Sequence, residues 1–148
     1  MTSITHALIG VAIANKIGNP WAAGTIALTA HFVCDMIPHW DWGTNHRNRP
    51  KSITGALAIT ETLIALFIGL VIMRQFVPSF LILSISVICS LLPDWLEAPY
   101  HILNPNAPKW MYWIYKPQSI FHSRAQLPWG MITQVVTVGI ALWWGFFS

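Results

Sequence analysis

Five apolar segments alternate with short polar stretches along the chain. They cover residues 4–17, 20–37, 53–73, 77–92 and 127–147. A helix needs about 20 residues to cross the hydrocarbon core of a bilayer. By that measure the second, third and fifth segments are long enough, and the first and fourth are marginal. The pattern predicts an all-α fold, a polytopic transmembrane helix bundle of about five membrane-embedded helices, in which residues 1–148 form a single domain.

The stretch between the last two apolar segments differs from the other connections. Residues 97–126 carry four prolines, so we expect a long loop there. Within it, residues 110–115 are rich in Trp and Tyr and lie between Lys109 and Lys116. Trp and Tyr side chains prefer the membrane–water interface. This run therefore predicts an interfacial aromatic segment in the headgroup layer.

The composition supports a membrane setting. Of the 148 residues, 55% are hydrophobic and only 9% are charged, whereas a soluble domain carries roughly 25% charged residues. Positive charge is concentrated after the second and fourth segments, and the positive-inside rule places those connections and the N-terminus in the cytoplasm. We therefore expect an integral protein of the inner membrane. The cations on that side are Arg47, Arg49, Lys51, Lys109, Lys116 and Arg124, against Lys16 and Arg74 on the other.

His31 and Asp35 are the strongest chemical signal in the sequence. They lie four residues apart near the end of an apolar segment, so both side chains lie on one helix face. A carboxylate and an imidazole at membrane depth are costly unless something binds them. A metal ion would account for both. The alternative interpretation is a hydrogen-bonded pair that holds two helices together.

Other histidines and acids fall on the same predicted face of the membrane. Glu61 is about 13 Å along its helix from Ser52, and His31 is about 9 Å from Ile37, so their depths are compatible with one buried site. Imidazole and carboxylate ligands suit a divalent metal, with Zn²⁺ preferred and Mn²⁺ or Fe²⁺ as alternatives. The predicted metal ligands are His6, His31, Asp35, His39, Asp94 and His122.

His39 raises a separate question of geometry. In a continuous helix His31 and His39 would be about 12 Å apart along the axis, too far to share one ion. Pro38 makes a continuous helix through this point unfavourable. Either two neighbouring ions, or a turn that folds His39 back, would resolve the difficulty.

A metal site of this kind favours hydrolytic chemistry. A bound metal lowers the pKa of water, and phosphate esters are natural substrates at a membrane surface. We expect Glu61 or Asp41 to act as the general base, and Arg124 to neutralise charge on the substrate together with Arg47 and Arg49. The expected partners are membrane lipids and a lipid or phosphoester substrate, with no nucleic acid.

The chain contains four short motifs: Thr5-His6, His31-x-x-x-Asp35 with Pro38 after it, Leu92-Pro93-Asp94 and Phe121-His122-Ser123. Together they resemble the motifs of the YdjM-like family of membrane-bound metal-dependent hydrolases. The resemblance implies a metal-dependent hydrolase whose metal ligands are His6, His31, Asp35, Asp94 and His122. It supports His39 and Asp41 as further ligands less directly. In that family Leu-Pro-Asp comes before His-x-x-x-Asp and is followed by Asp-His. Here the order is reversed, and Trp95-Leu96-Glu97 follows Asp94.

Two other functions are compatible with the sequence. The first is a metal-binding or ion-handling membrane protein without chemistry, which predicts polar side chains along a path to the outer face. The second is a small structural membrane subunit that binds a partner through its Trp-rich surface. A measurement of bound metal would separate the structural subunit from the two metal-binding functions. A measurement of ester turnover would then separate the hydrolase from the metal-binding protein without chemistry.

Overall fold

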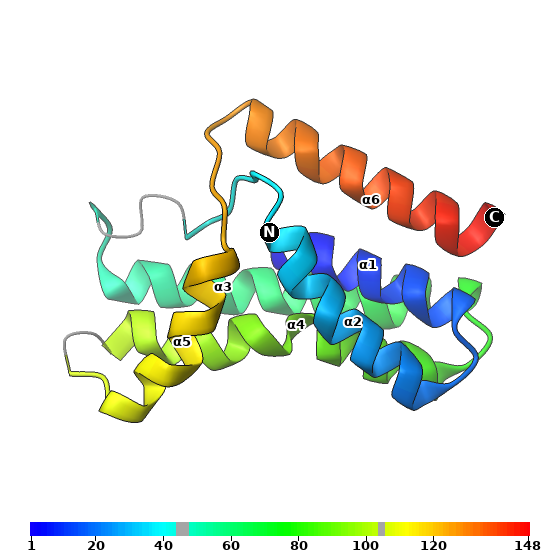
Figure 1. The fold of residues 1–148 in the computed structure, drawn as a ribbon, viewed down its shortest axis with the longest axis horizontal. Coiled ribbons are helices and arrows are strands. Elements are labelled where there is room, and N and C mark those ends of the chain that lie inside the picture. Colours follow the sequence, from blue (N-terminus) through cyan, green and yellow to red (C-terminus); the bar gives the residue numbers. More distant parts are fainter. Residues whose placement is uncertain (44–47, 104–105) are drawn as a thin grey trace.

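The computed structural model describes residues 1–43, 48–103 and 106–148. Within these ranges the chain is almost entirely helical and forms no β-strand, which confirms the all-α prediction (Figure 1). His46 and Arg47 lie outside the described residues. The α-helices are α1 (Ser3–Lys16), α2 (Pro20–Asp35), α3 (Lys51–Leu66), α4 (Phe80–Leu103), α5 (Lys109–Phe121) and α6 (Trp129–Phe147). A π-helix, η2 (Phe67–Ile72), and a 3₁₀ turn, η3 (Met73–Phe76), continue α3.

Helix α1 is the centre of the bundle. It packs against α4 on one side and α6 on another, while α2 packs along α4 (Figure 1). Ten residues of α1 are buried, nearly all of them small or apolar. The core therefore forms mainly between α1 and α4, where Ala7, Val11, Leu83, Val87 and Leu91 are inaccessible to solvent.

Local sequence signals fix where the first two helices begin. The hydroxyl of Thr2 accepts a hydrogen bond from the Thr5 amide and caps α1, which places His6 in the first turn. The Asn19 side chain accepts from the amides of Trp21 and Ala22, and Pro20 occupies the first position of α2. Asp35 is the last residue of α2.

Among the described residues, three helices are long and apolar enough to cross a membrane. They cover residues 51–76, 80–103 and 129–147. Helices α1 and α2 have only 14 and 16 residues, and the buried surface of α1 is that of a core helix. The structure thus indicates a membrane protein with three candidate spans rather than establishing five.

The prediction of a long loop over residues 97–126 was wrong. Helix α4 continues through Pro93 and Pro99 to Leu103, and the aromatic run lies inside α5. A proline removes one helical hydrogen bond and opens the preceding turn, but neighbouring groups in a bundle can satisfy the freed backbone. Here the carbonyl of Ser90, in the turn before Pro93, accepts a hydrogen bond from His31 Nδ1 at 2.7 Å.

Gly10 allows the close approach of α1 and α4. A Cβ at this position would lie 2.9 Å from Ser90 Oγ and 3.1 Å from Val87 Cα. We expect Gly10→Leu to lower the free energy of unfolding by about 1–3 kcal/mol, because the two helices must separate. Thermal unfolding in detergent measures the effect. Gly139→Leu is the control, since a Cβ there meets nothing within 4 Å, and an equal loss in both variants would contradict the prediction.

Candidate metal centre

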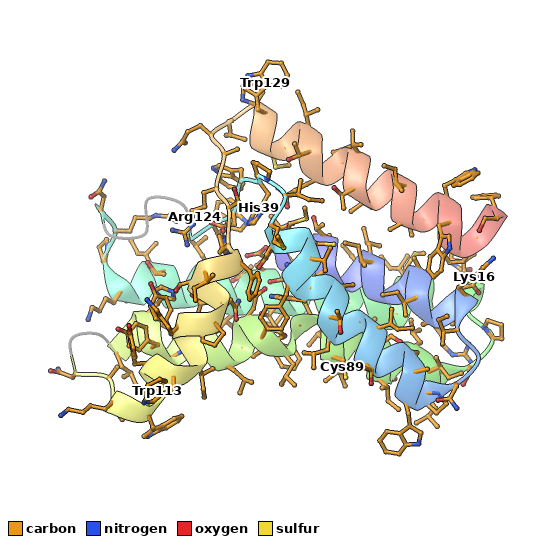
Figure 2. All side chains as sticks on the ribbon, viewed as in Figure 1. Lys16, His39, Cys89, Trp113, Arg124 and Trp129 are labelled. Carbon is orange, nitrogen blue, oxygen red and sulfur yellow. The ribbon has the colours of Figure 1, made fainter. Side chains whose placement is uncertain are left out.

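The structure brings the six predicted ligands together at one end of the bundle. They come from three helices and two loops: α1, α2, α4, the loop after α2, where Figure 2 labels His39, and the loop after α5. Among the described residues they form two groups, each with ligand atoms that all lie within 4.8 Å of one another. Both groups can therefore hold a metal ion. We call them the helix group (His6, His31 and Asp94) and the loop group (Asp35, His39 and His122).

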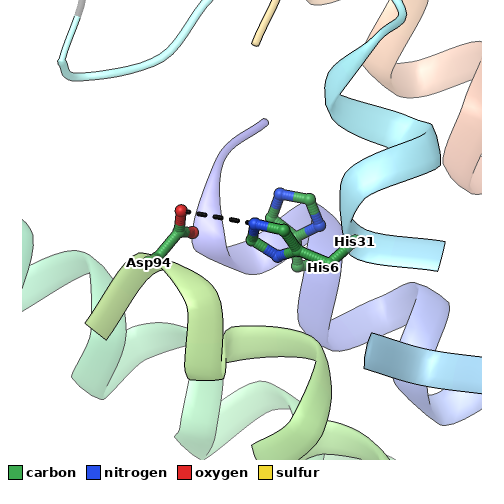
Figure 3. A group of neighbouring side chains, drawn as sticks. All are labelled: His6, His31 and Asp94. Carbon is green, nitrogen blue, oxygen red and sulfur yellow. Dashed lines mark ion pairs between the residues drawn. The ribbon is translucent and has the colours of Figure 1, made fainter. Parts of the chain in front are cut away.

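The helix group is contributed entirely by helices. The rings of His6 and His31 are stacked, with centroids 3.9 Å apart, and His31 Nε2 lies 3.6 Å from Asp94 Oδ1 (Figure 3). Both rings are about 1% exposed. Two buried imidazoles beside a carboxylate are a donor set that suits a divalent cation.

The loop group depends on the chain reversal after α2. His39 Nε2 lies 3.1 Å from His122 Nε2, and His122 Nε2 lies 2.8 Å from Asp41 Oδ2. The backbone holds the two loops together: His39 N–H donates to the carbonyl of Ser123, and Ala125 N–H donates to the carbonyl of His39. The reversal resolves the question of how His31 and His39 could both be metal ligands, because it places the two residues in different groups.

Asp35 lies between the two groups. One of its oxygens, Oδ1, is 3.2 Å from His6 Nε2 and 3.8 Å from His39 Nε2. The other, Oδ2, is 3.4 Å from His31 Nε2 and 3.5 Å from His122 Nδ1. The amino group of Met1 also contacts Asp35, so a cationic group already lies beside this carboxylate. A carboxylate in contact with ligands of two groups has the position of a bridging ligand.

Backbone carbonyls determine which ring nitrogen of two histidines faces the centre. His31 Nδ1 lies 2.7 Å from the Ser90 carbonyl, and His39 Nδ1 lies 2.8 Å from the Ile37 carbonyl. A carbonyl oxygen only accepts, so Nδ1 carries a proton in both rings, and Nε2 is the nitrogen that faces the centre. Metal-binding histidines are oriented in this way by their second nitrogen.

Two buried atoms of the centre have no hydrogen-bond partner among the described residues. They are Asp35 Oδ2 and His6 Nδ1. A buried carboxylate oxygen without a partner is costly, and the carboxylate is 1% exposed. The donor set and the buried Asp35 Oδ2 atom fit a divalent cation at this position.

The predicted catalytic residues lie around the same cavity. Glu61, Asp41 and Arg124 line it together with Asp94 and His122. Glu61 Oε1 accepts a hydrogen bond of 2.6 Å from the Ser3 amide. Burial raises the pKa of Asp41, but hydrogen bonds from His122 and His39 outweigh burial and hold that pKa well below its usual range. Asp41 is therefore a charged partner of His122 and a weak proton acceptor.

The sequence interpretation missed three polar residues beside the centre. Glu97 and His101 form a pair on α4, with Oε1 and Nε2 2.5 Å apart, and Gln118 of α5 donates to Asp94 Oδ1 at 2.9 Å. Asp94, Glu97 and His101 are spaced three and four residues apart, which puts them on one face of a helix. This spacing could have predicted a shared helix face, but the prolines within residues 97–126 led to the prediction of a loop instead.

The protonation of His122 predicts how metal binding depends on pH. Burial lowers its pKa, but the carboxylates of Asp35, 3.5 Å from Nδ1, and Asp41, 2.8 Å from Nε2, dominate and raise it to about 9. In the metal-free protein the ring is therefore charged at pH 7, and an ion must displace its proton. We expect the apparent affinity of the loop group to rise by about tenfold per pH unit from pH 7 to pH 9. Zinc titrations across this range measure it, and an affinity independent of pH would contradict the assignment of His122 as a ligand.

No protein-family model matches the chain, and no curated protein or solved structure is significantly similar to it. The geometry of the centre therefore carries the functional argument alone.

Proposed function

We propose that this chain is a membrane-embedded, metal-dependent hydrolase that acts on a lipid-linked or phosphate-containing ester at the cytoplasmic face of the inner membrane. The observation that carries the proposal is the position of Asp35 between two groups of histidine and carboxylate ligands. A purely structural polar pair needs one partner, whereas this carboxylate is surrounded by four imidazoles. Paired metal positions that share a carboxylate are typical of enzymes that hydrolyse esters of phosphate.

The donor set indicates which metal fits. His6, His31 and Asp94 would hold one ion, His39 and His122 a second, and Asp35 both. Neutral imidazoles with carboxylates and without thiolate ligands favour Zn²⁺, with Mn²⁺ or Fe²⁺ as alternatives. Such ions supply Lewis acidity and activate water for attack on an ester.

Side chains of the protein would accept the proton of the attacking water and neutralise the negative charge of the substrate. Glu61 lies beside the ligands Asp94 and His122 in the cavity wall, and we assign it as the group that takes a proton from the attacking water. Arg124 Nε is 3.8 Å from Asp41 Oδ2, and its side chain is 42% exposed. It is therefore held near the centre while still able to approach an anionic substrate.

Glu61→Gln tests this proposal. The Gln Oε1 atom can still accept from the Ser3 amide, so the contact between α3 and α1 is kept while the proton acceptor is lost. We expect the purified variant to keep its metal and its helix content, and to lose turnover of a phosphate ester by about 10²–10⁴-fold. Metal analysis and hydrolysis of a phosphatidic acid series in mixed micelles are the measurements. Unchanged turnover would remove Glu61 from the mechanism, and tightly bound metal without turnover of any ester would favour a non-catalytic metal-binding protein.

A further inference from the structure

Two cavities meet at the metal centre, and they differ in character. The first is small, with a volume of about 150 Å³, and lies against α3, α4, the start of α1 and the loop after α2; most of its exposed wall is apolar, although ionisable side chains also line it. Its outer walls are Thr54 and Ala58 of α3 and Ala98 and Ile102 of α4, and its inner end is formed by ligands of the centre. Both helices belong to candidate membrane spans. These residues lie in the first turns of α3 and the last turns of α4, so the cavity is at the membrane end that carries the metal centre.

The second cavity is more polar and has a volume of about 680 Å³. Three cationic side chains line it, Arg49, Lys51 and Arg124, together with the rings of Tyr100 and Tyr115, which stack with centroids 4.5 Å apart. A volume of this size accommodates a small-molecule group. The cations make it complementary to an anion, and guanidinium groups match the oxygens of a phosphate.

The two cavities share part of their walls. Thr54, Glu97, His101, His122 and Arg124 line both. One of these, His122, belongs to the loop group of the metal centre. The two cavities therefore adjoin each other beside the centre and share a wall that contains His122 and Arg124.

From this arrangement we infer that the ligand is an amphiphile with a phosphate headgroup in the cationic cavity and an apolar chain between α3 and α4. The inference rests on the proposed function and narrows its substrate to a lipid phosphate rather than a soluble phosphate ester. A soluble ester would gain nothing from the apolar walls of Ala58 and Ala98. A chain in that cavity enters from the cytoplasmic leaflet and keeps the ester bond next to the ligands Asp94 and His122.

A matched pair of substitutions on α3 tests where the chain lies. Ala58 faces the cavity, whereas Ala56 lies two residues away on the exposed side of the same helix. Full-length protein is treated with EDTA, so that turnover does not interfere, and binding is measured by native mass spectrometry. The probes are dioleoyl phosphatidic acid, which carries the phosphate and the chains, and glycerol 3-phosphate, which carries only the phosphate.

We expect Ala58→Phe to weaken phosphatidic acid binding by about tenfold or more and to leave glycerol 3-phosphate binding unchanged, because the added ring fills the apolar cavity. Ala56→Phe should bind both probes as the wild type does. The double variant Arg49→Gln/Lys51→Gln should weaken both probes, since it removes headgroup contacts. Ala98→Phe repeats the test from the opposite wall, in case Ala58→Phe does not fold.

Three results would overturn the inference. They are equal binding of phosphatidic acid by Ala58→Phe, Ala98→Phe and the wild type, equal loss in Ala56→Phe and Ala58→Phe, or tighter binding of glycerol 3-phosphate than of phosphatidic acid. None of these depends on metal or turnover. A protein that binds the lipid through the cavity but holds no metal and hydrolyses no ester would therefore retain this inference and overturn only the proposed hydrolase.

Discussion

Asp35→Asn is expected to empty both metal positions at once. The variant keeps the size of the side chain but loses the negative charge and one oxygen that lie between the helix group and the loop group. Since changes to partners of a ligand alone cost 10–100-fold in metal affinity, loss of the shared ligand should cost at least about 100-fold at each position. Metal analysis of the detergent-purified protein should find less than about a tenth of the wild-type content.

Two controls keep this experiment informative. Circular dichroism shows whether the variant is still helical, and Gly139→Leu gives the metal content of a variant changed on the open face of α6. If Asp35→Asn stays folded and binds as much metal as the wild type, the carboxylate has no part in metal binding. The polar cluster would then be a set of hydrogen bonds between helices.

His31→Ala and His122→Ala should each remove one metal ion and spare the other. His31 belongs to the helix group and His122 to the loop group, and the Asp35 carboxylate contacts both histidines. We expect about half of the wild-type metal content in each single variant and almost none in the double variant. Turnover should fall by about 10²-fold or more in each, because both positions would act on one ester.

The pattern of loss distinguishes two positions from one. If either single substitution removes all metal, the two groups form one site with a shared ion. If neither removes any, the histidines are structural. The bound metal in His31→Ala should also show the pH dependence described for His122, whereas the metal left in His122→Ala should show less of it, and titration at pH 7 and pH 9 compares them.

The helices and most of the centre followed from the sequence because burial constrains polar residues strongly in an apolar chain. His6, His31, Asp35, Asp94 and His122 had to find partners, and their positions at the ends of apolar segments left one region where all could meet. The spacing of His31 and Asp35 also determined that both would face the same way on α2.

The parts that the sequence did not predict depend on tertiary contacts. Helix α4 passes through Pro93 and Pro99, and His31 contacts its backbone at Ser90; no local preference contains information on such contacts between helices. The same error placed Glu97 and His101 in a loop. The prediction of five spans treated α1 as lipid-facing. Hydropathy alone does not distinguish an apolar residue that faces lipid from one that packs against another helix.

The two halves of the centre differ in how they are supported. Three helices that pack through the core hold the helix group, so its geometry changes only if the bundle opens. Two loops that bind each other through His39, Ser123 and Ala125 hold the loop group, and α5 and α6 flank one of those loops. A displacement of α5 would therefore reach both groups: it would move the loop that carries His122, and it would withdraw the Gln118 amide from Asp94 of the helix group.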